Sequence, residues 1–487
     1  MDEGLNRTDK EANRKIMTAR KPQPKFWQPE LLGLWSFDLP TEEKGSSPRS
    51  PAEEVHASAK ALPENRPLRS NLMEQVVLES NLFHACKRVV ANKGRAGVDG
   101  QTVQSLQGWL NDHVAELRED LLKGSYTPSP VLGVQIPKPG GGKRQLGIPT
   151  VKDRLVQQAI QQVLEPVLDP TFSESSYGFR RGRSAHDALR AGSAYVEEGY
   201  EIVVDLDLEK FFDRVNHDIL MSRLARHIED KALLGLTRRF LQAGMMTSGV
   251  CIPREEGTPQ GGPLSPLLAN LLLDDLDKEL ERRGHRFCRY ADDCNIYVRS
   301  EKAGERVLKS VTDYLETKLK LQVNQSKSHA GPVWERKFLG YRILRGGRLT
   351  VAPQSIARAK ERVRKITRRN RGRSLKSVIG ELNTFIRGWV GYFRLAHAKG
   401  VTEKLDAWVR RKLRCLKLKH CKRAIGVGRF LRSQGLDHDS AWKLAGSGKG
   451  WWRKSLTPQS HRAMGTKWFV EIGFEGFANR YEQAKCI

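Results

Sequence analysis

Tyr290-Ala291-Asp292-Asp293 sets two adjacent carboxylates between two strand-like runs, residues 286–290 and 295–298. In a regular strand, neighbouring side chains point to opposite faces of the sheet. Both carboxylates can lie near one site only where a sharp turn breaks this alternation. The stretch therefore predicts a β-hairpin with a pair of acids at its tip, placed to bind a divalent metal ion.

A metal site at this turn requires a third acid from elsewhere, because Mg²⁺ takes about six oxygen ligands, of which carboxylates usually supply a few. The β-branched run 202–206 predicts a strand that delivers Asp207 at its end, shortly before two aromatic residues. Asp205 lies one step further back on the same face. Two ions about 3.5–4 Å apart, bridged by Asp207 and one acid of the turn, would activate a primer hydroxyl and stabilise a leaving pyrophosphate. The acids thus predict a metal-dependent polymerase.

Two further blocks favour catalysis over the ordinary interpretation of an isolated Asp-Asp, which is a solvated turn. The block 257–270 is a loop rich in proline and glycine that runs into an apolar helix. The block 136–149 combines glycines, which permit a tight reversal, with cations spaced to meet a triphosphate.

With these blocks the chain resembles a family, the bacterial group II intron reverse transcriptases, which double as maturases. The blocks that carry the resemblance follow the family's order and cover roughly residues 75–345. They are residues 92–100, 136–149, 176–184, the segment around Asp207, residues 257–270, the acidic turn and residues 338–341.

The resemblance implies a role for each matching residue. Asp207, Asp292 and Asp293 are expected to be catalytic and to hold two Mg²⁺ ions. The residues expected to bind the incoming dNTP are Phe212, Gln260, Lys138, Lys143 and Arg144. A ring at Phe212 would lie against the sugar of the incoming nucleotide and exclude a 2′-hydroxyl there. The three cations have an alternative interpretation as solvated surface residues.

The charge balance favours a nucleic-acid partner. The chain of 487 residues carries a formal net charge of +28, and polyanions bind such proteins through counterion release. Residues 351–430 hold 23 Lys or Arg but four Asp or Glu. Apolar residues at helical spacing predict a helix over residues 375–393 and a second one from about residue 405, each with a cationic outer face. The cations expected to contact RNA phosphates are Arg410, Arg411, Arg414 and Lys417.

The segment 382–393 resembles the maturase region of the same family, which serves as the polymerase thumb and as a surface for intron RNA. Its aromatic residues Phe385 and Trp389 are better explained by core packing, which leaves RNA contact to the cations. Phosphate contacts carry affinity rather than sequence choice. Intron specificity is therefore expected to come from the shape of the folded RNA.

The C-terminal part, residues 426–487, changes to short pieces broken by glycine and resembles the small DNA-binding region of this family. Many relatives continue into an endonuclease with paired cysteines, but the seven cysteines here include no C-x-x-C pair. We expect no target-strand cleavage by this chain, and entry of a mobile intron into single-stranded or replication-fork DNA. Scattered odd cysteines fit a reducing compartment.

No secretory signal or membrane span is predicted, because the first thirty residues are polar and charged and no apolar run approaches about 18 residues. We expect a cytoplasmic, nucleoid-associated ribonucleoprotein with no membrane partner. Residues 1–68 lack sustained periodicity and are predicted to be mostly disordered, apart from an apolar cluster between Trp27 and Phe37.

The predicted fold class is α+β. Residues 69–345 would form the fingers and palm of a right-hand polymerase with a small antiparallel sheet, residues 350–425 a helical thumb and maturase domain, and residues 426–487 a small helical module. The function expected first is an RNA-directed DNA polymerase that uses an RNA template, a DNA primer or target and dNTPs, and that binds group II intron RNA for splicing and retrohoming. Two alternatives remain: a reverse transcriptase with a host task in repair or antiviral defence, and a non-catalytic splicing cofactor.

Overall fold

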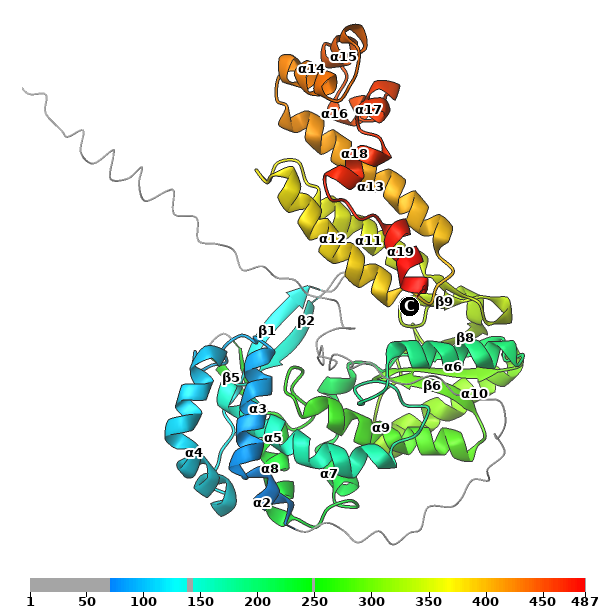
Figure 1. Cartoon of the computed structure of the whole chain (residues 1–487). Coiled ribbons are helices and arrows are strands. Elements are labelled where there is room, and N and C mark those ends of the chain that lie inside the picture. Colours follow the sequence, from blue (N-terminus) through cyan, green and yellow to red (C-terminus); the bar gives the residue numbers. More distant parts are fainter. Residues whose placement is uncertain (1–70, 138–142, 248–249, 487) are drawn as a thin grey trace, which may run out of the picture. The chain divides into compact units, whose positions relative to one another are not determined.

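Four antiparallel strands in the order β6-β7-β3-β8 carry the acidic turn in the computed structural model (Figure 1). They are β3 (Ile202–Leu206), β6 (Arg286–Tyr290), β7 (Asp293–Val298) and β8 (His329–Pro332). Side chains of β3 alternate between two cores: Val203 belongs to one, and Val204 to the other. The sheet is therefore covered on both faces. The structure describes residues 71–137, 143–247 and 250–486, so the predicted N-terminal extension, residues 1–68, lies outside the described residues.

Helices cover both faces of this sheet (Figure 1). Helix α6 (Ala185–Glu197) packs on β6 and shares a core with Val203. Helices α9 (Ser265–Arg282) and α10 (Glu301–Tyr314) pack on the opposite face and join the core of Val204. The remaining helices of this region are α7 (His217–Leu224) and α8 (Lys231–Gln242).

The predicted fingers contain a second small sheet with the order β2-β1-β4-β5. Its strands are β1 (Val131–Pro137), β2 (Lys143–Ile148), β4 (Met245–Thr247) and β5 (Val250–Ile252), and the helices of this region are α2 (Leu72–Val76), α3 (Glu79–Ala91), α4 (Leu106–Lys123) and α5 (Val151–Leu168). Leu82, Cys86 and Val89 of α3 are buried at helical spacing. Leu78 precedes the helix and is exposed.

The thumb region follows a two-stranded sheet, β9 (Tyr341–Ile343) and β10 (Leu349–Val351). Its helices are α11 (Pro353–Ile366), α12 (Leu375–Tyr392) and α13 (Lys399–His420). Ser374 caps α12 by accepting the backbone N–H of Ser377. Trp389 is buried and meets the ring of Phe477 edge to face, so core packing of this aromatic residue is confirmed.

Six short helices follow α13. They are α14 (Ala424–Ser433), α15 (His438–Ala445), α16 (Trp451–Lys454), α17 (Pro458–Ala463), α18 (Thr466–Glu471) and α19 (Phe477–Lys485). The last one, α19, packs against both α12 and α13. The predicted α+β class, with small sheets and a helical C-terminal region, is confirmed. No helix in the part of the chain that the structure describes has the length and apolar character of a membrane span.

Candidate active site at the acidic turn

Ala291 and Asp292 form the two-residue turn that joins β6 to β7, because Tyr290 pairs with Asp293 across the hairpin. Ala291 has a φ of +58° and lies in the left-handed region, which two-residue hairpin turns commonly require. Ala291 is buried, Asp292 is half-buried and Asp293 is exposed. The turn therefore sends its alanine inward and its acids toward the surface.

Asp207 follows β3 directly and lies at the same end of the sheet. The last pair between β3 and β7 joins Leu206 to Cys294, so each partner is the immediate neighbour of a predicted metal ligand. The backbone of Asp207 is fixed twice: its N–H donates to Ser328 Oγ at 3.0 Å, and its carbonyl accepts the N–H of Asn324 at 2.8 Å. The structure thus brings the three predicted acids to one end of the palm sheet.

Negative charge accumulates at this end of the sheet. The pKa of the Asp293 carboxyl is raised to about 7, first by removal of water and then by the charges of Asp292, Asp205 and Asp207. Asp293 is itself an exposed residue, so contact with bulk water reduces the part of this pKa rise that comes from removal of water. The repulsion by the three neighbouring carboxylates remains. Lys327 neutralises part of this negative charge, because its Nζ lies 3.1 Å from Asp207 Oδ2.

The donor set is the kind that a hard divalent cation selects, because Mg²⁺ prefers carboxylate oxygens and leaves several positions to water and phosphate. The repulsion among the acids is what a bound cation would relieve. Within residues 71–137, 143–247 and 250–486, no group of three or more His, Cys, Asp or Glu side chains is arranged to hold a metal ion. The residues fit magnesium by donor chemistry and by charge.

The predicted nucleotide-binding residues belong to segments that contact one another. Phe212 lies in a single helical turn after β3, and its ring packs against Phe211 with centroids 5.0 Å apart. Its carbonyl accepts the N–H of Thr258 at 2.6 Å, and the carbonyl of Gln260 accepts the N–H of Gly147 at 3.1 Å. Backbone hydrogen bonds therefore join three of the predicted blocks: the Phe212 turn to residues 257–270, and residues 257–270 to residues 136–149.

Two of the three predicted triphosphate-binding cations, Lys143 and Arg144, lie at the start of β2. Lys143 begins β2, pairs with Pro137 and is exposed. The backbone of Arg144 pairs with Ile136. Lys138 lies outside the described residues. An exposed position suits contact with a ligand as well as ordinary solvation, so the role of these cations stays a prediction.

Three of the four predicted RNA-binding cations of α13 contact the C-terminal helices or the residues that join them. Arg414 is buried: its Nε donates to the carbonyl of Met464 at 3.0 Å, and its guanidinium lies over the ring of Phe469. Burial, and then the charge of Arg410, lowers the pKa of Arg414 to about 10. The cations of Arg411 and Lys417 lie 3.9 Å and 4.3 Å from the ring centres of Trp452 and Phe430. Arg410 is half-buried.

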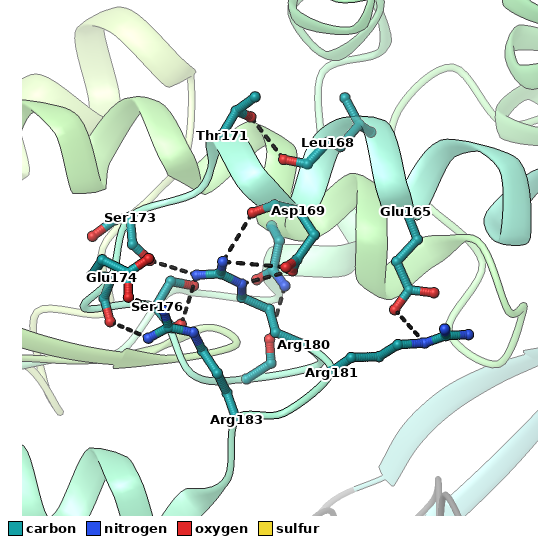
Figure 2. Close-up of polar contacts among 12 residues, drawn as sticks. Glu165, Leu168, Asp169, Thr171, Ser173, Glu174, Ser176, Arg180, Arg181 and Arg183 are labelled. Atoms are coloured by element: carbon teal, nitrogen blue, oxygen red, sulfur yellow. Dashed lines mark hydrogen bonds and ion pairs between the residues drawn. The ribbon is translucent and has the colours of Figure 1, made fainter. Parts of the chain in front are cut away.

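Another buried arginine organises the loop 173–183, which we call the support loop. Arg180 donates from Nε to Asp169 Oδ1 at 2.7 Å and from Nη1 to the carbonyls of Ser173 and Ser176, at 2.6 Å and 3.1 Å (Figure 2). Figure 2 also shows Arg181 directed away from this cluster, toward Glu165. Arg180 therefore closes the support loop on itself.

Sequence reasoning did not single out Lys327 or Arg289. Lys327 follows Asn324-Gln325-Ser326, a typical turn composition, and nothing in the sequence pairs it with Asp207. Arg289 lies in β6, separated from the turn by Tyr290, where strand alternation gives no reason for a buried cation. Asp277 of α9 is buried and pairs with Arg289, but residues 274–279 around it are mostly charged, so the sequence carries no signal that this acid has a buried partner.

Two family models match separate parts of the chain. The model of the family "Reverse transcriptase (RNA-dependent DNA polymerase)" matches residues 136–343, and that of the "Group II intron, maturase-specific domain" matches residues 356–433. Protein YkfC of Escherichia coli is 33% identical over 305 residues, which span 54% of this chain and 80% of YkfC.

The group II intron-encoded protein LtrA of Lactococcus lactis is 33% identical over 210 residues, which span 42% of this chain and 34% of LtrA. This chain therefore matches about a third of the length of that relative. Among solved structures, a partial Cas6-RT-Cas1–Cas2 complex is 27% identical over 50% of this chain and 42% of that chain, with a TM-score of 0.34.

Proposed function

Since the chain belongs to the family of group II intron-encoded reverse transcriptases and maturases, we propose that it copies RNA into DNA and binds group II intron RNA to assist splicing. The single observation that supports polymerization most strongly is the convergence of Asp207, Asp292 and Asp293 at one end of the palm sheet. The match of residues 356–433 to a maturase-specific domain supports splicing assistance by the same chain.

In this proposal Asp207, Asp292 and Asp293 hold two magnesium ions. Bound there, the ions would supply activation of the primer 3′-hydroxyl and neutralisation of the leaving pyrophosphate. The task of the chain is orientation: the β3–β7 register and the hydrogen bonds to Asp207 keep the carboxylates at one place without reorganisation during the reaction.

The same proposal gives the neighbouring segments the task of selecting the nucleotide. Phe212 would place its ring against the sugar, and Gln260 would line the pocket. Lys138, Lys143 and Arg144 would grip the triphosphate from the β1–β2 hairpin, which the hydrogen bond between Gly147 and Gln260 ties to the pocket. Charged donors suit this task because they bind phosphate oxygens strongly.

The expected partners are intron RNA, an RNA template and a DNA primer or target. Reverse transcription of the inserted intron would complete its retrohoming. The half-buried cations of α13, Arg410, Arg411 and Lys417, would meet RNA phosphates. Buried Arg414 would act through the helices that it holds. The net charge of +28 supports such partners, and we place the protein in a cytoplasmic, nucleoid-associated ribonucleoprotein.

The test combines two assays on the same preparations: primer extension on an RNA template with dNTPs and Mg²⁺, and splicing of the flanking precursor RNA. The variant Asp292→Asn/Asp293→Asn should lose extension and keep splicing. The control Glu301→Gln/Glu305→Gln removes two charges from the exposed face of α10 and should keep both. Extension by the Asp292→Asn/Asp293→Asn variant at the wild-type rate would contradict the polymerase proposal. Wild-type extension without any acceleration of splicing would favour a host task.

A further inference from the structure

The support loop, residues 173–183, packs directly on the acidic turn. Its backbone adds to the edge of β6, because the N–H of Tyr177 donates to the carbonyl of Arg289 and the N–H of Arg289 donates to the carbonyl of Ser175, each at 2.9 Å. Gly178 is so close that a Cβ on it would lie 2.3 Å from the backbone nitrogen of Ala291. The loop thus touches the one residue of the turn that has left-handed geometry.

Arg289 joins the turn to two other segments. Its guanidinium is fully buried, and each of its three nitrogens donates. Nε donates to Asp277 Oδ1 at 2.7 Å, and Nη2 donates to Asp277 Oδ2 at 2.5 Å and to Ser176 Oγ at 2.7 Å. Nη1 donates to Asn270 Oδ1 at 2.9 Å and to the carbonyl of Ala291 at 3.0 Å. One side chain therefore connects α9, the support loop and the turn.

The hydrogen bond to the Ala291 carbonyl bears on catalysis because Ala291 is strained. A left-handed conformation costs a residue other than glycine about 1 kcal/mol or more, and it persists where the surroundings over-determine it. Here Arg289 holds the carbonyl of Ala291, and Gly178 leaves no space on the side of its nitrogen. The direction in which Asp292 and Asp293 leave the hairpin is set by this peptide.

We propose that Arg289 is a positioning residue for the polymerase: it fixes the left-handed Ala291 peptide and thereby aims Asp292 and Asp293. The proposal rests on the function proposed above. Asn270 reinforces the arrangement, since its Nδ2 donates to the carbonyl of Gly178 at 2.8 Å. Ser176 is shared by two arginines, with its carbonyl bound by Arg180 (Figure 2) and its hydroxyl by Arg289.

A purely structural role for Arg289 would predict a different result from the same variants. Removal of Arg289 alone would leave Asp277 charged and buried, and the chain would lose stability for that reason. The double variant Arg289→Met/Asp277→Leu removes both charges, and apolar replacements of a buried pair are often tolerated. It also removes the bond to Ala291. The control is Arg223→Met/Asp275→Leu, which removes the ion pair between Arg223 Nε of α7 and Asp275 Oδ2 of α9, 2.5 Å apart.

Three measurements distinguish the two roles. They are steady-state primer extension, which gives kcat and KM for dNTP, the melting temperature, and the affinity of the protein alone for Mn²⁺ from the electron paramagnetic resonance signal of the free ion. Relative to the control, we expect Arg289→Met/Asp277→Leu to lower kcat at least about tenfold with KM changed less than about threefold, since small displacements of reacting groups are costly. We expect Mn²⁺ affinity to fall by about tenfold.

The proposal is overturned if the folded double variant keeps kcat and Mn²⁺ affinity within about twofold of the control. If that variant does not fold, Arg289→Lys decides, because it keeps a cation beside Asp277 but lacks the fork that reaches Ala291. A wild-type kcat in Arg289→Lys would overturn the proposal, and a loss of about tenfold would support it. Failure of the proposed function is recognised separately, by wild-type extension in Asp292→Asn/Asp293→Asn, and the Mn²⁺ measurement then still tests Arg289.

Discussion

The carboxylate of Asp406 in α13 accepts the backbone N–H of Phe477, the first residue of α19, at 2.6 Å. Its other oxygen accepts the N–H of Ala478 at 2.9 Å. Burial raises the pKa of Asp406, and these two hydrogen bonds oppose that rise. A side chain of the thumb thus caps the last helix of the chain, where free amide groups otherwise lack partners. The last helix is therefore structurally part of the thumb.

Loss of this cap should loosen α19. We expect Asp406→Ala to reduce the local free energy of opening by about 2 kcal/mol, since two amide groups lose a buried acceptor. Hydrogen exchange of the α19 amides in the full chain should then quicken by about 30-fold. Glu403→Ala, an exposed position on the same helix, is the control. Equal exchange in the two variants would show that the cap carries no stability.

The contrast between α12 and α19 explains how far the sequence determines the fold. The stripe of α12, including Val378, Leu382 and Ile386, is buried as its helical spacing predicts, because local periodicity reports which face is apolar. The docking of α19 depends on Asp406, 71 residues away along the chain. No local pattern records such a partner, so the sequence predicted a C-terminal module but not its place on the thumb.

The candidate site divides in the same way. The positions of Asp207, Asp292 and Asp293 follow from strand ends and a turn, which are local features, and the structure brings them together. Such reasoning does not find Arg289, because its partners Asp277 and Ser176 come from α9 and the support loop rather than from its own strand. The burial of Arg414 could not be predicted in this way either. Helical spacing predicts an outward position for Arg414, but the short helices α17 and α18 bury its side chain.

Phe212 should control the choice between dNTP and rNTP. Replacement by alanine removes the ring proposed to meet the sugar, so we expect the preference for dATP over ATP, as a ratio of kcat/KM, to fall at least about tenfold. The neighbouring ring Phe211 is buried in the core, and Phe211→Leu should keep the preference. Steady-state extension with each nucleotide measures both. An unchanged preference in Phe212→Ala would remove this residue from the nucleotide pocket.

Arg414 should act on stability rather than by direct contact with RNA. Arg414→Ala leaves the carbonyl of Met464 without its donor and removes packing from Phe469, so we expect a loss of about 2 kcal/mol. The dependence of intron RNA affinity on salt should stay the same in this variant. Arg410→Ala should instead reduce the slope of log K against log salt by about one. A reduced slope in Arg414→Ala would indicate that its guanidinium leaves the protein to bind phosphate.

Magnesium should stabilise the protein through the acids of the turn. Because Asp205, Asp207 and Asp292 repel Asp293, a cation that binds among them favours the folded state by mass action. We expect 10 mM Mg²⁺ to raise the melting temperature of the wild-type protein by about 1–2 °C. Asp292→Asn/Asp293→Asn, which removes two of the charges, should gain much less, and Glu301→Gln/Glu305→Gln should respond like the wild type. EDTA should reverse the gain and stop primer extension without unfolding the chain, since the cores on both faces of the sheet consist of apolar side chains that bind no ion. The same gain in the Asp292→Asn/Asp293→Asn variant as in the wild type would place the bound ion elsewhere on the protein.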